Sequence, residues 1–204
     1  MEHDIKRINS YDYPGFDKEI LRQHGAFVVD DRYRCGFKIT GEDSAIVYYE
    51  DKDSLYEVID EFRFYTEHIT SFFDMKGNLI KSFPPIEVFE IDIDKIQPSQ
   101  FYVDEDKVNA IKSFIGKEED LIIPLTKSGE RFISLDGHTR LYYAAFMGYK
   151  KVKGFITEAD EYIFKFAQEA VNRGILSPKD LVMISHEDYK IKWNKFCEDF
   201  FKSN

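Results

Sequence analysis

Residues 133–140, with the sequence ISLDGHTR, hold side chains of the types that bind phosphate groups. The pattern predicts an apolar strand that ends in an Asp-Gly turn and continues directly into a helix. Backbone N–H groups and the positive end of the helix dipole make a helix N-terminus an anion site, and Gly137 lets a phosphate approach the backbone closely. His138, Thr139 and Arg140 would add a ring N–H, a hydroxyl and a guanidinium to the same anion. Asp136 could hold a magnesium ion that bridges two phosphates.

The same residues also fit a plain structural interpretation, which the sequence leaves open. Asp136 and Gly137 would then form an ordinary turn, Arg140 would be solvated, and His138 would cap a nearby backbone group.

The elements that must position this segment form a compact α/β unit over residues 86–156. Asp104, Glu105 and Asp106 suit the first turn of the first helix, and Gly148 suits the position just after the second helix. The expected elements are a strand 86–91, a helix 104–115, strands 121–125 and 131–134, a helix 138–147 and a strand 152–156.

The sequence pattern of residues 26–83 predicts an α+β domain of unknown role. Residues 1–25, which precede it, are expected to form an irregular arm with one short helix at 17–23. The expected elements of the α+β domain are an antiparallel meander over 26–50, a helix over 55–62 and a hairpin over 68–83. Pro84-Pro85 can continue neither a ladder nor a helix, and we place the boundary between the two halves there.

The last segment, residues 157–204, predicts a helical tail packed on the α/β unit. One helix ends at Gly174, and Ser177-Pro178 is a typical helix start. A further helix places four aromatic residues on one face, which we expect to be buried: Tyr189, Trp193, Phe196 and Phe200.

Composition narrows the function classes. The 204 residues (24.1 kDa) suit one large domain or two small ones, and 19 Phe with 13 Tyr supply a dense aromatic core. A net charge of −10 makes DNA binding an unfavourable interpretation.

The two cysteines lack metal-site spacing, and no apolar run approaches a membrane span, so we expect a cytoplasmic protein without a membrane segment. Glu67-His68 and His186-Glu187 are expected to be surface or capping pairs rather than metal ligands.

Two motifs in residues 86–156 resemble those of the ParB N-terminal domain and sulfiredoxin superfamily. Gln97-Pro98-Ser99-Gln100 is similar to the N-P-x-Q element of ParB proteins, and Gly137-His138-Thr139-Arg140 is similar to their G-E-R-R element. The resemblance implies that these segments close over a nucleotide (ATP, ADP or CTP, with magnesium). Gly137 to Arg140 would contact the phosphates, and Pro98 to Gln100 would form the facing wall.

Differences between this chain and the motifs of the superfamily indicate which branch of the superfamily the chain resembles most. Sulfiredoxins carry a catalytic Cys where this chain has His138, so repair of oxidised cysteine is excluded. The acidic, aromatic tail offers no basic face of the kind that ParB proteins use to read DNA. The free-serine kinase branch carries Asp-Gly-His and a later Arg, which residues 136–140 resemble most closely. Its catalytic Glu aligns with Gln100, a neutral amide that cannot act as a general base.

Two function classes follow from these observations. The first is an enzyme, a phosphotransferase of the serine kinase type, in which Asp136 and His138 are catalytic and Asp136 holds the metal. Glu105 or Asp104 could replace the missing base if the loop folds back toward the phosphate. The second is a non-catalytic, nucleotide-responsive module whose N-terminal half binds a protein partner.

Overall fold

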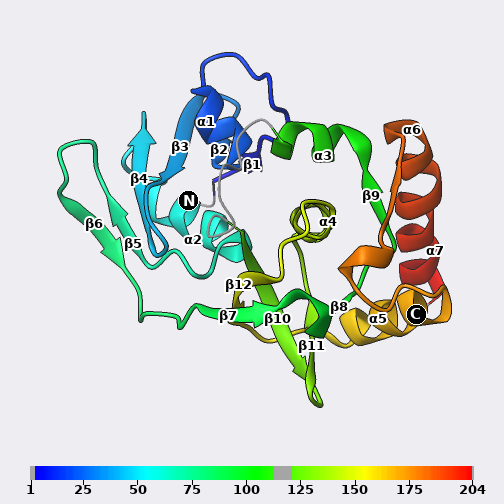
Figure 1. Cartoon of the computed structure of the whole chain (residues 1–204). Coiled ribbons are helices and arrows are strands. Elements are labelled where there is room, and N and C mark those ends of the chain that lie inside the picture. Colours follow the sequence, from blue (N-terminus) through cyan, green and yellow to red (C-terminus); the bar gives the residue numbers. More distant parts are fainter. Residues whose placement is uncertain (1–2, 113–120, 204) are drawn as a thin grey trace. The chain divides into compact units, whose positions relative to one another are not determined.

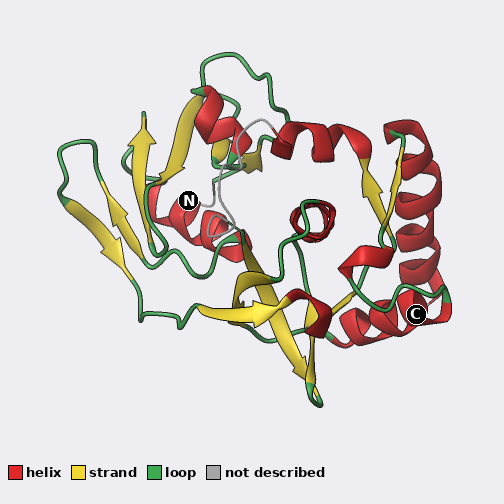
Figure 2. Cartoon of the chain, viewed as in Figure 1, coloured by secondary structure: helices red, strands yellow, loops and turns green. Residues whose placement is uncertain are grey.

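The computed structural model describes residues 3–112 and 121–203, and its internal contacts divide the chain into two units, residues 1–87 and 88–204. This division lies close to the boundary expected at Pro84-Pro85. The combination of sheets and helices confirms the α+β fold class, with helices at the C-terminal end (Figures 1 and 2).

The first unit is built on a six-stranded sheet with the strand order β1-β2-β3-β4-β5-β6 (Figure 1). Its elements are β1 (Ile5–Arg7), α1 (Lys18–Arg22), β2 (Ala26–Val29), β3 (Tyr33–Ile39), β4 (Ser44–Tyr49), α2 (Leu55–Tyr65), β5 (Ser71–Phe73) and β6 (Leu79–Ser82).

The core of the first unit is aromatic. Phe62 on the apolar face of α2 stacks on Phe37 of β3 with ring centroids 4.2 Å apart, and Phe27 and Phe72 meet both rings edge-on. All four rings are fully buried. Edge-to-face and offset contacts of this kind stabilise a core beyond the area that they bury, so they fix α2 on the sheet.

Two sequence expectations for this unit need correction. The sheet is mixed rather than antiparallel, because β4 and β5 run parallel. The helix α2 lies between these strands in the chain, and a strand-helix-strand connection returns the chain in the same direction. The arm over residues 1–25 also contains β1, which pairs with β2 from Ile5 opposite Val29 to Arg7 opposite Phe27, and is therefore not irregular beyond its helix.

The second unit is built on a five-stranded sheet with the order β7-β12-β10-β11-β8, and a separate pair joins β13 to β9 (Figure 2). Its strands are β7 (Phe89–Asp92), β8 (Ile96–Pro98), β9 (Tyr102–Asp104), β10 (Ile122–Ser128), β11 (Arg131–Ser134), β12 (Lys151–Ile156) and β13 (Val182–Ile184). Its helices are η1 (Ile93–Lys95), α3 (Glu105–Lys112), α4 (His138–Phe146), α5 (Glu161–Asn172), η3 (Pro178–Asp180), α6 (His186–Tyr189), η4 (Lys190–Asn194) and α7 (Lys195–Ser203). Residues 113–115, the last part of the helix expected over 104–115, lie outside the described residues.

The parallel pairing of β8 with β11 sets up the two faces of the sheet. Gln97 lies opposite Ile133, and Pro98 lies opposite Ser134. Because successive side chains of a strand point to opposite faces, the first pair faces α5 and the second pair faces the start of α4. The α5 face is apolar, since Ile133 clusters with Ile163 and Ala167 of that helix.

The tail differs from the expected helical segment in two ways. Val182–Ile184 form the strand β13, which pairs in parallel with β9, so the tail is not wholly helical. The aromatic stripe of the last helix is half-buried rather than buried, because it covers the outer side of the unit. Trp193 and Phe196 pack edge-on against Phe101, and Phe200 packs against Phe166.

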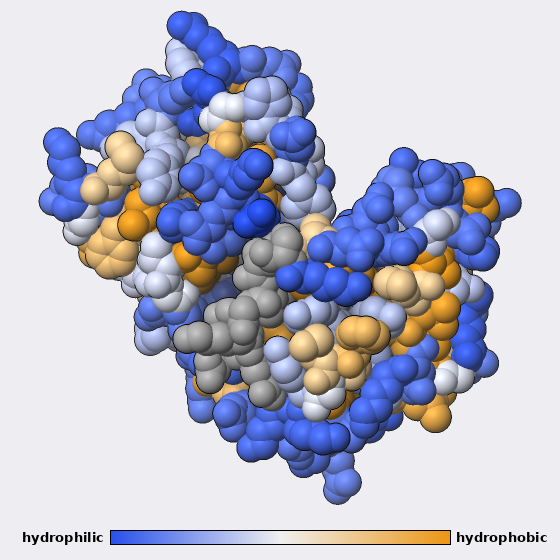
Figure 3. All heavy atoms as spheres, turned by 45° about the horizontal axis from the view of Figure 1, so that its top comes forward, coloured by the Kyte–Doolittle hydropathy of each residue, from blue (hydrophilic) through white to orange (hydrophobic). Residues whose placement is uncertain are grey.

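The surface in Figure 3 is mostly hydrophilic, with smaller apolar areas between the charged side chains. Within residues 3–112 and 121–203, none of the helices combines the length and the apolar character that a membrane crossing needs.

Candidate functional site

The N-terminus of α4 has the geometry that the sequence predicts. β11 ends at Ser134, and the chain turns through Asp136 and Gly137 into the helix. Gly137 is the N-cap residue, with a left-handed backbone (φ 77°), and its carbonyl accepts the first helical hydrogen bond, from the Leu141 N–H. Because glycine has no side chain, no side-chain group caps the first turn of this helix.

Gly137 is required here for space as well as for its backbone conformation. A Cβ atom at this position would lie 3.0 Å from Cδ1 of Ile123 and 3.1 Å from both Nε and Nη2 of Arg140. The guanidinium of Arg140 therefore folds back over the start of its own helix.

Arg140 is held in that position from two sides. Its Nη1 atom donates to the Ile122 carbonyl at 2.8 Å, and its Nη2 atom lies 3.9 Å from the Asp136 carboxylate. The Arg140 side chain is 31% exposed and that of Asp136 is 71% exposed. A cation at the positive end of a helix is unfavourable by itself, and an ion pair at 3.9 Å with an exposed carboxylate compensates it only in part. The site is thus electrostatically suited to an added anion.

His138 points into the protein rather than toward that anion position. The residue is 5% exposed, and its Nε2 atom lies 3.2 Å from the Ser99 backbone nitrogen and 3.1 Å from the Ser134 hydroxyl. The Ser99 hydroxyl donates to the Ser134 carbonyl at 2.7 Å. Because the Ser99 N–H can only donate, Nε2 is the acceptor and the neutral ring carries its proton on Nδ1.

This environment lowers the pKa of His138 to about 4. Burial is the main cause, because it disfavours the charged ring. The negative charge of Asp136 raises the pKa and the positive charge of Arg140 lowers it, each to a smaller extent. A ring that is neutral at pH 7 and bonded to Ser99 holds the protein's own loop in place.

The loop after β8 lies against the last helix. Pro98 is buried, and Gln100 is half-buried with its Nε2 atom donating to the Tyr189 hydroxyl at 2.9 Å and to the Tyr102 carbonyl at 2.5 Å. Burial raises the pKa of Tyr189, which is only partly offset by the hydrogen bond from Gln100, so this phenol is neutral at pH 7. The amide of Gln100 therefore acts here as a donor.

The structure brings together most of the residues that the sequence singles out. Asp136, Gly137, Thr139 and Arg140 lie at the start of α4, and the loop from Pro98 to Gln100 is attached to them through Ser99 and the His138 ring. Ser99 lies within the expected wall from Pro98 to Gln100, but its bond to His138 was not expected from the sequence. Ser134 and Tyr189 were not expected to position site residues at all. Of these three residues, only Ser99 carried a signal in the sequence, its place beside Gln100 within the first motif.

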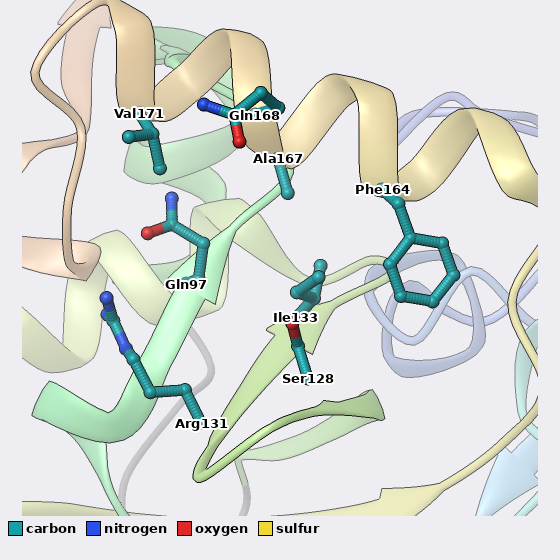
Figure 4. Close-up of a pocket in the computed structure, with 8 residues that line it drawn as sticks. All are labelled: Gln97, Ser128, Arg131, Ile133, Phe164, Ala167, Gln168 and Val171. Atoms are coloured by element: carbon teal, nitrogen blue, oxygen red, sulfur yellow. The ribbon is translucent and has the colours of Figure 1, made fainter.

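A cavity of about 330 Å³ lies on the opposite face of β8 and β11, under α5 (Figure 4). Phe164 and Ala167 of α5 line the cavity on the helix side, and Gln97 and Arg131 line it on the strand side. The Gln97 amide nitrogen donates to the Pro98 and Ile175 carbonyls, which fixes the orientation of the amide. Its Oε1 atom is buried and has no hydrogen-bond partner within the described residues.

Comparisons with known proteins add little to this geometry. No protein-family model and no curated protein matches the chain. Among solved structures, the chain is similar to the protein Atu1540 from Agrobacterium tumefaciens, with 18% identity and a TM-score of 0.31 over 47% of this chain and 53% of that one. The match therefore spans about half of Atu1540, and likeness at this level carries no inference about fold or function. The resemblance to ParB and sulfiredoxin proteins stays a prediction.

The buried state of His138 predicts a pH dependence of stability. Between its folded pKa of about 4 and the ordinary value of 6.5, the unfolded chain binds the extra proton, so the free energy of unfolding rises with pH through this window. The full difference is on the order of 3 kcal/mol, all present above pH 6.5 and lost toward pH 4. Denaturant titrations from pH 4.5 to 7.5 on the native chain and on His138→Asn check this. An unchanged pH slope in the variant would contradict it.

Proposed function

We propose that this chain is a nucleotide- or phosphate-binding protein of the ParB/sulfiredoxin type, which places the phosphate groups of ATP, ADP or CTP at the N-terminus of α4. The observation that carries the proposal is the Arg140 guanidinium folded over Gly137, where a helix N-terminus and a cation present positive charge at one place. Thr139 adds a hydroxyl in the first turn of the helix. A phosphate group would neutralise both charges.

Asp136 and His138 take different roles in this proposal. Asp136 is exposed beside Arg140, where it would share a magnesium ion with the bound phosphates. His138 holds Ser99 and thereby positions the loop from Pro98 to Gln100, which we propose to be the facing wall of the nucleotide site. The two cysteines, Cys35 and Cys197, are free, which suits a reducing cytoplasm.

A small-molecule phosphotransferase is the activity that we propose for this site. Phosphoryl transfer depends on positioning and charge neutralisation, which Arg140 and a magnesium ion at Asp136 would supply. The general base is the weaker part, because Gln100 donates hydrogen bonds and Asp104 is buried at 2% exposure. We therefore expect binding to be the stronger property and turnover the slower one.

The alternative is a nucleotide-responsive interaction module without turnover. The observation that favours it lies in the first unit, where Phe64 of α2 is 76% exposed and Tyr56 of the same helix is 54% exposed. Exposed aromatic side chains are typical of surfaces that bind other proteins. In this alternative, the first unit contacts a protein partner and the second binds the nucleotide.

The first test concerns Arg140. Melting the native chain with ATP, ADP, CTP or phosphate, each with magnesium, should raise Tm, since saturation at about 100 times Kd adds roughly 2.7 kcal/mol. Arg140→Ala should remove most of this shift, because the guanidinium is lost from the helix N-terminus. Lys127→Ala is the matched control, since it removes a cation from the exposed end of β10. Equal ligand shifts in the native chain and Arg140→Ala would refute the phosphate site.

A second test concerns the metal. If Asp136 shares a magnesium ion with the nucleotide, removing magnesium with a chelator should weaken ATP binding by about tenfold or more, and Asp136→Asn should be insensitive to the chelator. Isothermal titration with ATP in the presence of magnesium or EDTA measures both. Equal affinity of the native chain in the two conditions would leave Arg140 and the helix N-terminus as the whole site.

A third test separates the enzyme from the module. We expect the native chain to phosphorylate free serine slowly, while Gln100→Glu should accelerate it, because a positioned base is worth about 10² to 10⁴ in rate. A carboxylate cannot donate to the Tyr102 carbonyl, so the new side chain is released from that contact. Phosphoserine and nucleotide hydrolysis are measured side by side, with threonine and no acceptor as controls. Nucleotide binding without turnover in either protein would favour the module.

A further inference from the structure

The pairing of β13 with β9 brings together two helix starts that are far apart in sequence. Ile184 lies opposite Asp104, the last residue of β9. Two residues after Ile184, His186 begins α6, and one residue after Asp104, Glu105 begins α3. The parallel register therefore places the imidazole of His186 beside the first turn of α3.

Three side chains with metal-ligating atoms meet at this point: Asp104, Asp106 and His186. The His186 Nδ1 atom lies 2.7 Å from Oδ2 of Asp104, and Oδ1 of Asp104 accepts a hydrogen bond of 3.0 Å from the Asp106 backbone nitrogen. One ligating atom from each of the three side chains lies within 4.8 Å of the other two. This cluster was not expected from the sequence, in which His186 is paired only with its neighbour Glu187.

Part of this arrangement has a simple structural explanation. Asp104 caps α3, and its contact with His186 ties the two helices together. That explanation leaves out Asp106, because the cap uses the backbone of Asp106 and not its carboxylate. Two carboxylates held this close repel each other, and the Asp104 side chain is only 2% exposed, so solvent cannot screen its charge well.

A divalent cation would relieve this repulsion and fits the donor set. Zinc takes carboxylate oxygen and imidazole nitrogen at roughly 2.0 to 2.2 Å, so two ligand atoms of a tetrahedral site lie roughly 3.4 Å apart. The His186 and Asp104 atoms would need to separate by well under 1 Å, and the Asp106 carboxylate would move inward. The imidazole favours first-row transition ions over magnesium and calcium, which prefer oxygen ligands alone.

We propose that Asp104, Asp106 and His186 form a binding site for one divalent transition-metal ion of the zinc or manganese class. The site is separate from the proposed magnesium at Asp136 and does not depend on the proposed nucleotide function. Three protein ligands leave at least one coordination position for water or another ligand. Tyr189 lies three residues after His186 on the same side of α6, and its hydroxyl accepts a hydrogen bond from the Gln100 amide.

The experiment uses the intact chain and the metals alone. Isothermal titration with Zn²⁺, Mn²⁺ and Mg²⁺ should give one site per chain, with zinc bound more tightly than manganese and manganese more tightly than magnesium. Asp106→Asn and His186→Gln should each weaken zinc binding by at least about tenfold, because each removes one ligand. Cys197→Ser and Asp188→Asn are the controls: the first removes a half-exposed thiol that could bind zinc, and the second removes a carboxylate from α6.

Asp106 is exposed, so Asp106→Asn should keep the native circular dichroism spectrum. If His186→Gln fails to fold, the zinc affinity of Asp106→Asn alone tests the proposed metal site. Loss of zinc affinity in Asp106→Asn, with both controls unchanged, supports the site. Zinc binding that survives Asp106→Asn, disappears in Cys197→Ser, or is no tighter than magnesium binding would overturn it. None of these titrations contains nucleotide, so failure of the phosphate site at Arg140 would not affect the result.

Discussion

Burial of the His138 imidazole is the constraint on which the candidate site depends. Burying a polar ring at 5% exposure is costly, and hydrogen bonds from the Ser99 N–H and the Ser134 hydroxyl to its Nε2 atom reduce that cost. These partners lie at the ends of β8 and β11, so one side chain joins two strand ends to the first turn of α4. The positions of Gly137 and Arg140 relative to the loop after Pro98 follow from this junction.

The sequence predicted those elements whose signals are local. The apolar spacing of Leu55, Val58 and Phe62 identified α2, and the Asp-Gly turn identified the start of α4. The sequence did not predict β1, β8, β9 or β13, which have three residues each and form only by pairing with other strands. The mixed order of the first sheet was missed for a related reason: the β4–α2–β5 crossover was interpreted as two separate antiparallel elements.

The sequence predicted which residues at the start of α4 form the candidate site, but not the directions in which the His138 and Gln100 side chains point. Asp136, Gly137, Thr139 and Arg140 are neighbours in sequence, so their meeting at one helix start followed from the chain itself. The direction of the His138 ring depends on Ser99, 39 residues earlier, and that of Gln100 depends on Tyr189, 89 residues later. No local pattern encodes partners at such separations. The assignment to a family rests on the motifs alone and is a prediction of the same kind.

The parallel pair of β9 and β13 also determines the order in which the second unit can be completed during synthesis. Val103 pairs with Met183, so β9 waits for a strand that the ribosome adds eighty residues later. A nascent chain that ends at Asn172 already holds the five-stranded sheet and α5, yet β9 and the start of α3 still lack their partner. Closing a loop of this length has an entropic cost that is compensated only when β13 has been added. Residues 182–184 therefore supply the pairing that β9 lacks until then.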